Sequence, residues 1–121
     1  MKEKRHYIRI NTDFVVWAQA DMDTYNKYFI YGGLAAKNLG GGGILIETDE
    51  SMAIGMLLEL KFYIPNSDAI EAIGQIMRVE KTSKSKFEVG IKFTTLEKDD
   101  KKNIINFCKR NSKKPVKKKQ L

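Results

Sequence analysis

Apolar and polar residues alternate along most of the chain with the two-residue period that is typical of β-strands. Residues 11–20 (N-T-D-F-V-V-W-A-Q-A) are rich in β-branched and aromatic side chains and predict a strand with Trp17 on one face. The opposite face of this strand holds Phe14, Val16 and Ala18. Turn residues follow, and a second strand is predicted over residues 28–37, with a break or bulge at Gly32-Gly33.

The same pattern continues through the middle of the chain. Four further strands are predicted, at residues 44–46, 56–64, 69–82 and 87–93. The longer three alternate through Leu58, Leu60, Phe62 and Ile64, through Ile73, Gln75, Met77 and Val79, and through Phe87, Val89, Ile91 and Phe93. Short turns and no helical stretch separate these strands, so the sequence predicts a mainly β fold that is a closed or nearly closed antiparallel barrel.

The period changes only near the end of the chain. Ile104, Ile105 and Cys108 are spaced as one face of a helix, and the acidic pair Asp99-Asp100 falls in its first turn, where the helix dipole favours negative charge. A closing helix is therefore predicted over residues 98–110. Residues 111–121 are rich in lysine and poor in apolar residues, so we expect a disordered tail.

Length and composition indicate one domain, residues 1–110, in a chain of 121 residues. No run approaches the roughly 18 apolar residues of a transmembrane helix, and no apolar segment follows the charged start, so we expect a cytoplasmic protein with no transmembrane segment. Cys108 is the single cysteine and His6 the single histidine. We therefore expect no disulfide, metal site or cofactor.

The net charge of +7 lies in the tail. Seven of the 22 Lys and Arg residues fall in the range 109–119, which leaves 15 basic and 15 acidic residues in the rest of the chain. The body of the domain is thus balanced, and no specific nucleic-acid binding is expected. The tail itself is interpreted as a solubilising end or as a contact for an acidic partner, nucleic acid or anionic membrane.

Two of the four arginines, Arg5 and Arg9, lie four residues apart next to the start of the chain. The guanidinium group is a planar fork that can grip a phosphate or a guanine edge at two points, so this pair is a candidate anion site. A solvated basic patch is an equally good interpretation of the arginines alone. A second candidate is Asn38-Leu39-Gly40-Gly41-Gly42-Gly43, whose glycines permit positive φ angles and close approach of a ligand to the backbone, or only form a tight corner.

Taken together and in order, these motifs resemble those of the PilZ domain, a bacterial receptor for the second messenger cyclic di-GMP. The family pattern is R-x-x-x-R before a strand, D/N-x-S-x-x-G between two later strands, a six-stranded antiparallel barrel and a C-terminal helix. Arg5 and Arg9 match the first motif, and the second maps onto Asn38, Gly40 and Gly43. The likeness runs from about residue 4 to residue 110 and includes V-G-I-K-F at residues 89–93.

The resemblance implies that Arg5, Arg9, Asn38, Gly40 and Gly43 bind cyclic di-GMP, with Lys4 as a further candidate contact. It also implies that residues 1–9 form a flexible arm that folds over the barrel when the nucleotide binds, and that the signal passes to an unidentified partner protein. Gly40 stands where the family has serine, which removes a hydroxyl used at the ligand.

Three other functions fit the sequence less well. The principal alternative is an adaptor of the same fold with weak or no cyclic di-GMP binding. The presence of both motif arginines argues against this alternative, and glycine in place of the motif serine at residue 40 argues for it. An oligonucleotide-binding barrel would need aromatic residues on a basic face, which the balanced charge does not support. An enzyme is not expected, because the sequence contains no Ser/His/Asp set and no catalytic residues in a shared motif.

Overall fold

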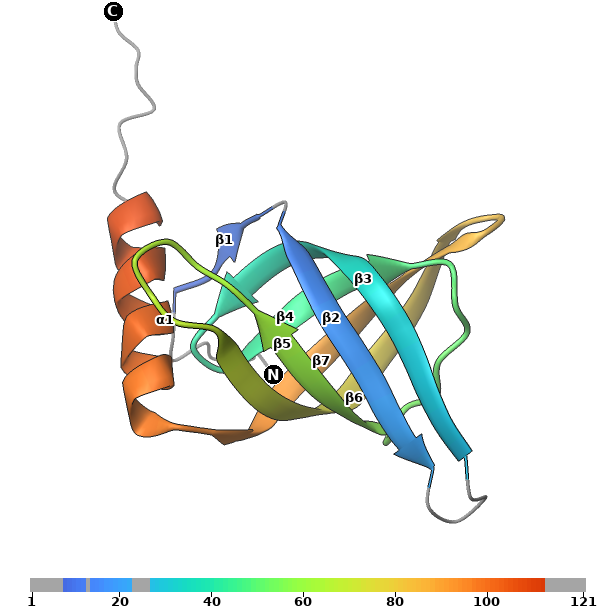
Figure 1. Ribbon diagram of the computed structural model, residues 1–121. Helices are drawn as coiled ribbons and strands as arrows, with labels where there is room; N and C mark the ends of the chain where they lie inside the picture. Colours follow the sequence, from blue (N-terminus) through green and yellow to red (C-terminus); the bar gives the residue numbers. More distant parts are fainter. Residues whose placement is uncertain (1–7, 13, 23–26, 113–121) are drawn as a thin grey trace, which may run out of the picture.

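The computed structural model of the protein describes residues 8–12, 14–22 and 27–112 (Figure 1). Seven strands and one helix follow one another along the chain. In order they are β1 (Ile10–Asn11), β2 (Val15–Met22), β3 (Lys27–Gly40), β4 (Gly43–Thr48), β5 (Leu57–Phe62), β6 (Ile70–Ser83), β7 (Lys86–Leu96) and α1 (Lys98–Ser112).

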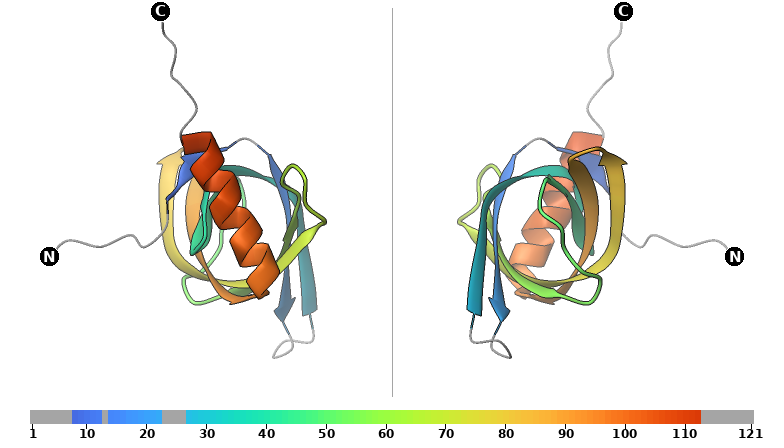
Figure 2. Two further views of the ribbon diagram at one scale, coloured as in Figure 1. Left: turned by 90° about the vertical axis from the view of Figure 1, so that its left-hand side faces the viewer. Right: turned by 90° about the vertical axis from the view of Figure 1, so that its right-hand side faces the viewer.

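All strand pairings are antiparallel, and the spatial order is β1-β3-β2-β5-β6-β7-β4. A further pairing of β3 with β4 joins the two sides of the sheet, so six strands form a closed ring, which is visible end-on in Figure 2. The two-residue β1 stays outside this ring and pairs with β3 beyond the point where β2 ends its pairing. The predicted six-stranded antiparallel barrel with a C-terminal helix is confirmed.

The core fills the barrel with the inward-facing residues of each strand. Val16 and Phe62 are fully buried, whereas Trp17 is 53% exposed, as the alternation of residues 11–20 predicts. Phe62 lies between two other rings, with centroid distances of 5.6 Å to Phe14 and 6.3 Å to Phe93. Stacking at these distances adds to the burial of the rings, so this aromatic row is a centre of the hydrophobic core.

The alternation predicted for residues 69–82 has the wrong phase. Ile73 and Met77 are exposed, and the buried face of β6 is formed instead by Ile70, Ala72, Gly74 and Ile76. A β-bulge explains the error: Ile76 pairs with Ile91 and Arg78 with Gly90, so Met77 is an extra residue on β6. The extra residue reverses the phase, and Val79 beyond it packs against the core as predicted.

The break predicted at Gly32-Gly33 is a bulge within one continuous strand. Ala18 pairs with Gly32 and Gln19 with Ile30, which leaves Tyr31 as the extra residue of β3. The bulge allows this long strand to bend around the barrel, so it pairs with β2 along its first part and with β4 along its last part.

The helix α1 contacts β3 and β1 and lies across one end of the barrel (Figure 2). Its buried residues are Ile104 and Cys108, and the Cys108 thiol donates a hydrogen bond to the carbonyl oxygen of Leu39 at 3.3 Å. The helix extends two residues past the predicted end, so Asn111 and Ser112 belong to it rather than to a tail. The rest of the predicted tail, residues 113–121, lies outside the described residues.

The helix α1, the one helix among the described residues, is not long and apolar enough to span a membrane. No group of three or more His, Cys, Asp or Glu side chains within these residues is arranged to hold a metal ion.

We predict that the Cys108 thiol reacts with a disulfide reagent about a hundredfold more slowly in the native protein than in the unfolded chain at pH 8. Burial raises its pKa from 9.0 to about 11, which lowers the reactive thiolate fraction by about that factor. Cys108 is the only cysteine, so absorbance of the released chromophore reports on it alone. Equal rates in water and in concentrated guanidinium chloride would contradict the buried placement.

Candidate ligand-binding face at the β3–β4 hairpin

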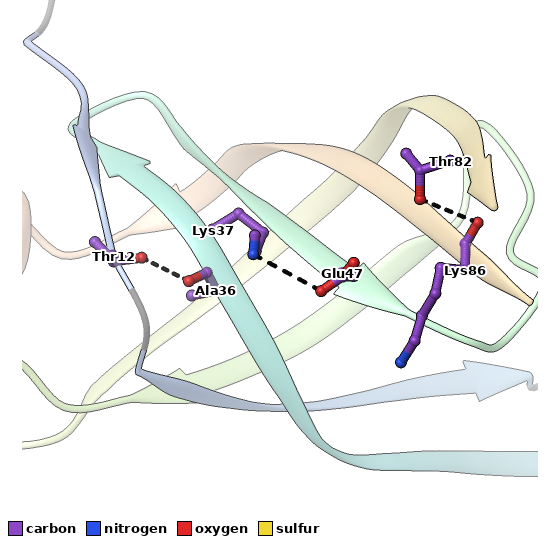
Figure 3. A network of polar contacts seen from close by, with 6 residues as sticks. All are labelled: Thr12, Ala36, Lys37, Glu47, Thr82 and Lys86. Atoms are coloured by element: carbon purple, nitrogen blue, oxygen red, sulfur yellow. Dashed lines mark hydrogen bonds and ion pairs between the residues drawn. The ribbon is translucent and has the colours of Figure 1, made fainter.

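The N-terminal segment is fixed along the end of β3. Ile10 pairs with Leu39 and Asn11 with Asn38. Thr12 adds two hydrogen bonds. Its amide donates to the carbonyl of Lys37 at 2.9 Å. Its hydroxyl donates to the carbonyl of Ala36 at 2.7 Å (Figure 3). These bonds bring the second arginine of the N-terminal motif to the strand that carries Asn38 and Gly40.

Arg9 lies directly over Gly40. A Cβ atom added at Gly40 would lie 2.9 Å from Cγ of Arg9 and 3.1 Å from the carbonyl oxygen of Ile8. Gly40 is therefore buried beneath the Arg9 stem, whereas Arg9 itself is exposed. Gly40 does not adopt a positive φ, so the left-handed conformation that its glycine neighbours suggested is not present there. Space beneath Arg9, and not backbone conformation, limits what residue fits.

The glycine run forms a tight hairpin. Gly40 and Gly43 are the last paired residues of β3 and β4, and Gly41-Gly42 form the turn between them. The carbonyl of Gly42 accepts a hydrogen bond from the amide of Phe93 at 3.0 Å. A Cβ at Gly43 would collide with the carbonyl oxygen of Ile91, so glycine is required here because two strand backbones approach closely.

The register also shows what lies beyond the hairpin on the outer surface. Gly43 pairs with Lys92 of β7, whose side chain is exposed. The next outward position of β7 is Gly90, and a Cβ there would lie 3.6 Å from Cβ and Nε of Arg78 on β6. We call this surface the glycine-lined face. It comprises Gly40, Gly43 and Gly90, with Arg9 at one side and Lys92 and Arg78 at the other.

The face is positively charged. Within the described ranges, neither Arg9 nor Lys92 forms an ion pair with a carboxylate. Arg78 has one weak partner, Glu80, at 3.9 Å, and both side chains are well exposed. Asn38 is half-buried beside Asn11 and offers an amide donor and acceptor at the same edge. Cationic side chains on two sides of the face suit an anionic ligand, and a guanidinium can also stack on a planar one.

The structure thus brings together four of the six site residues predicted from the sequence. Arg9, Asn38, Gly40 and Gly43 lie around the hairpin, while Lys4 and Arg5 lie outside the described residues. The sequence interpretation missed Lys92 and Arg78. The alternation of residues 89–93 could have found Lys92, because Val89 and Ile91 point inward and leave the lysine on the outer surface. The alternation of β6 could not place Arg78, because the bulge at Met77 changes the face on which the following residues lie.

A comparison with known families decides the identity of this arrangement. The PilZ domain family matches residues 3–110, nearly the whole described chain. The chain belongs to the PilZ domain family. Both the hairpin and the Arg9 segment of this PilZ domain lie within the match, so the resemblance inferred from the two motifs is confirmed.

Solved structures share the fold at low sequence identity. MotI/DgrA, the inhibitor of motility of Bacillus subtilis, superimposes with a TM-score of 0.76 at 18% identity, over 92% of this chain and 52% of that one. The PilZ domain of YcgR from Escherichia coli, solved with c-di-GMP, gives 0.64 at 12% identity, over 91% and 95%. MrkH of K. pneumonia gives 0.61 at 12% identity, over 93% and 53%.

The chain spans about half the length of MotI/DgrA and of MrkH. It matches none of the curated proteins with which it was compared. The three solved structures share the fold of this chain over 91–93% of its length.

We predict that Gly43→Ala lowers the free energy of unfolding by about 1–3 kcal/mol, because the added methyl group forces β4 and β7 apart. Gly90→Ala is the matched control. Its methyl group would make ordinary contacts of 3.6 Å with Arg78, so we expect a change within about 0.5 kcal/mol. Urea denaturation of both variants measures the difference, and equal losses would contradict the backbone approach assigned to Gly43.

Proposed function

We propose that the protein is a receptor that binds cyclic di-GMP on the glycine-lined face, changes conformation on binding and acts through a partner protein. Membership of the PilZ family supports the choice of ligand. The observation that carries the proposal is the register of β1 on β3, which sets Arg9 beside Asn38 and Gly40. Two motifs about thirty residues apart in the sequence therefore meet in one place.

The chemistry of the face fits that of the ligand. Cyclic di-GMP presents two phosphates and two guanines. Arg9 can form forked, charge-assisted bonds to a phosphate or to guanine O6 and N7, and can stack flat on a purine. Lys92 supplies a second positive charge across the glycine floor, and Arg5 would add a further guanidinium four residues before Arg9. None of these roles involves a cofactor or a catalytic group.

Binding would act on the N-terminal segment first. Arg9 covers Gly40, so a nucleotide that contacts the motif strand must share this surface with the Arg9 stem or displace it. The same segment continues into β1, and β1 contacts both β3 and α1. A change at Arg9 therefore has a short physical route to the helix that covers the barrel end, where a partner could sense it.

An adaptor with weak or no nucleotide binding is the second candidate function. One observation favours it: the position of the family serine is glycine, and the space that a serine side chain would need is filled by Arg9. Calorimetric titration with cyclic di-GMP, with GTP and cyclic GMP as controls, separates the two functions.

We predict that Arg9→Ala and Arg5→Ala each weaken cyclic di-GMP binding by about 1.5–3 kcal/mol, roughly ten- to hundredfold, through loss of a forked charge-assisted contact. The melting temperature should change little, because the exposed Arg9 side chain is outside the core. Arg110→Ala is the matched control, since this exposed arginine lies in the last turn of α1 and should bind like the wild type. Unchanged affinity in both N-terminal variants would overturn the arginine site.

We predict that Gly40→Ala weakens binding and that Gly40→Ser binds more tightly than Gly40→Ala. Both variants push Cβ against Arg9 and the Ile8 carbonyl, but only serine restores the hydroxyl of the family motif. One net hydrogen bond is worth about 0.5–1.5 kcal/mol, a severalfold difference in Kd. Calorimetric titration of both variants under the same conditions cancels the steric cost that they share. If Gly40→Ser binds cyclic di-GMP no more tightly than Gly40→Ala, residue 40 does not face the nucleotide.

A further inference from the structure

A second hollow lies on a different part of the barrel surface. It has a volume of about 830 Å³ and lies over the outer face of β2, β5 and β6, where β7 leads into α1. We call it the acidic groove. The residues that line it include Trp17, Glu59, Glu71, Ile73, Glu97 and Asp100. None of these residues belongs to the glycine-lined face.

The floor of the groove carries exposed apolar side chains. The strand register places Trp17 beside Lys61, and Lys61 beside Glu71, across three neighbouring strands that can be followed in Figure 1. On the adjacent row, Glu59 pairs with Ile73. Trp17 is 53% and Ile73 37% exposed. A tryptophan left open on an outer barrel surface offers a large, rigid contact area to a partner.

The charge of the groove is opposite to that of the chain. Five carboxylates and one lysine line it, a net charge of −4, whereas the whole protein carries +7. The ion pairs Lys37–Glu47 and Arg78–Glu80 both lie outside the groove. Glu59 accepts a hydrogen bond from the side-chain amide of Gln19 at 2.7 Å, and this neutral donor does not cancel its charge.

The carboxylates also act on one another. The pKa of Asp100 is raised, first by partial burial and then by Glu97, Asp99, Asp68 and Glu71. Lys61 is the cation that faces the same groove. Negative charge is therefore concentrated here to the point of mutual repulsion, and a cationic partner would relieve it.

We propose that the acidic groove docks an extended, lysine- or arginine-rich segment of a partner protein, with an aliphatic or cationic side chain against Trp17. Charge complementarity selects the partner, and the apolar floor supplies contact area, as in interfaces whose aromatic centre is surrounded by charged groups. An arginine or lysine over the indole ring would add a cation–π contact. The inference rests on the proposed function in one respect, that the receptor acts through a partner, and it names the chemistry of that partner.

The lysine-rich tail of the same chain is a poor occupant on length alone. The helix leads away from the groove, and Asp100 and Ser112 are about 18 Å apart at 1.5 Å per residue. Residues 113–121 span at most about 30 Å when fully extended, so most of that length is used in returning to the rim. The tail of a second copy has no such limit and is an outcome of the test below.

Trp17 makes the proposal directly measurable, because it is the only tryptophan of the chain. The probe is an acetylated and amidated nonapeptide of eight lysines around a central leucine, and the control peptide has glutamate in place of every lysine. We expect the lysine peptide to shift the Trp17 emission to shorter wavelength with saturation, and the glutamate peptide to leave it unchanged. No shift with the lysine peptide at millimolar concentration would overturn the proposal.

Charge reversal locates the contact. The double variant Glu59→Lys/Glu71→Lys should weaken binding of the lysine peptide at least tenfold. Asp49→Lys/Glu50→Lys makes the same change of charge at two exposed residues outside the groove and should weaken it less than threefold. Equal losses in the two variants would mean that the peptide senses only net charge, which overturns the groove. Trp17→Ala, titrated by calorimetry, should also weaken binding.

Two further measurements separate the remaining outcomes. Sedimentation of the wild type and of the Glu59→Lys/Glu71→Lys variant tests self-association. If the wild type is a dimer and the variant is a monomer, the groove binds a second copy of this chain, and the proposal of a separate partner protein is wrong. Cyclic di-GMP titration of the same variant should match the wild type. If the protein binds the lysine peptide as expected but binds no cyclic di-GMP, the proposed receptor function is wrong and the proposal for the acidic groove is retained.

Discussion

Strand β3 pairs with three other strands, and these pairings close the barrel. Its first part pairs with β2, its last part pairs with β4, and β1 occupies the stretch of edge that β2 leaves free. The β3–β4 pairing closes the ring, so the barrel has no open edge between these strands. The carbonyl of Leu39 on β3 also accepts the hydrogen bond from Cys108, which ties the helix to the same strand. Barrel closure, helix docking and the glycine-lined face thus share one element.

Glycine has two different tasks in this face. Position 43 requires glycine because the backbones of β4 and β7 approach closely there, so any side chain would separate the two strands. The residue at position 40 is limited by the Arg9 side chain that lies over it, and a nucleotide could move that side chain. The first glycine therefore belongs to the architecture of the hairpin, while the second belongs to the surface on which we propose that cyclic di-GMP binds. A family motif can hold both kinds of position within four residues.

The barrel presents two surfaces of opposite charge. The glycine-lined face has Arg9, Lys92 and Arg78 at its sides, and the acidic groove holds five carboxylates. Strand β6 contributes to both, with Arg78 in the first and Glu71 and Ile73 in the second. A receptor that holds an anionic nucleotide on one surface and a basic partner on the other keeps the two ligands from competing for the same groups. In the function that we propose, the sheet between the two surfaces would connect them, and α1 contacts β3 and β1 at the barrel end.

The fold class could be predicted from the amino-acid sequence, because two-residue alternation, glycine turns and one helical period are local properties of the chain. The sequence also determined family membership, since the two motifs and their order are written in it. It misjudged the phase of β6, because a bulge at Met77 is a matter of pairing with β7 and leaves no mark in local alternation. Three features could be seen only in the folded chain: Arg9 covers Gly40, Gly43 faces the Ile91 backbone, and Lys92 and Arg78 lie on the same face. Each of these depends on register between strands distant in the sequence, and register is fixed by the closed barrel as a whole.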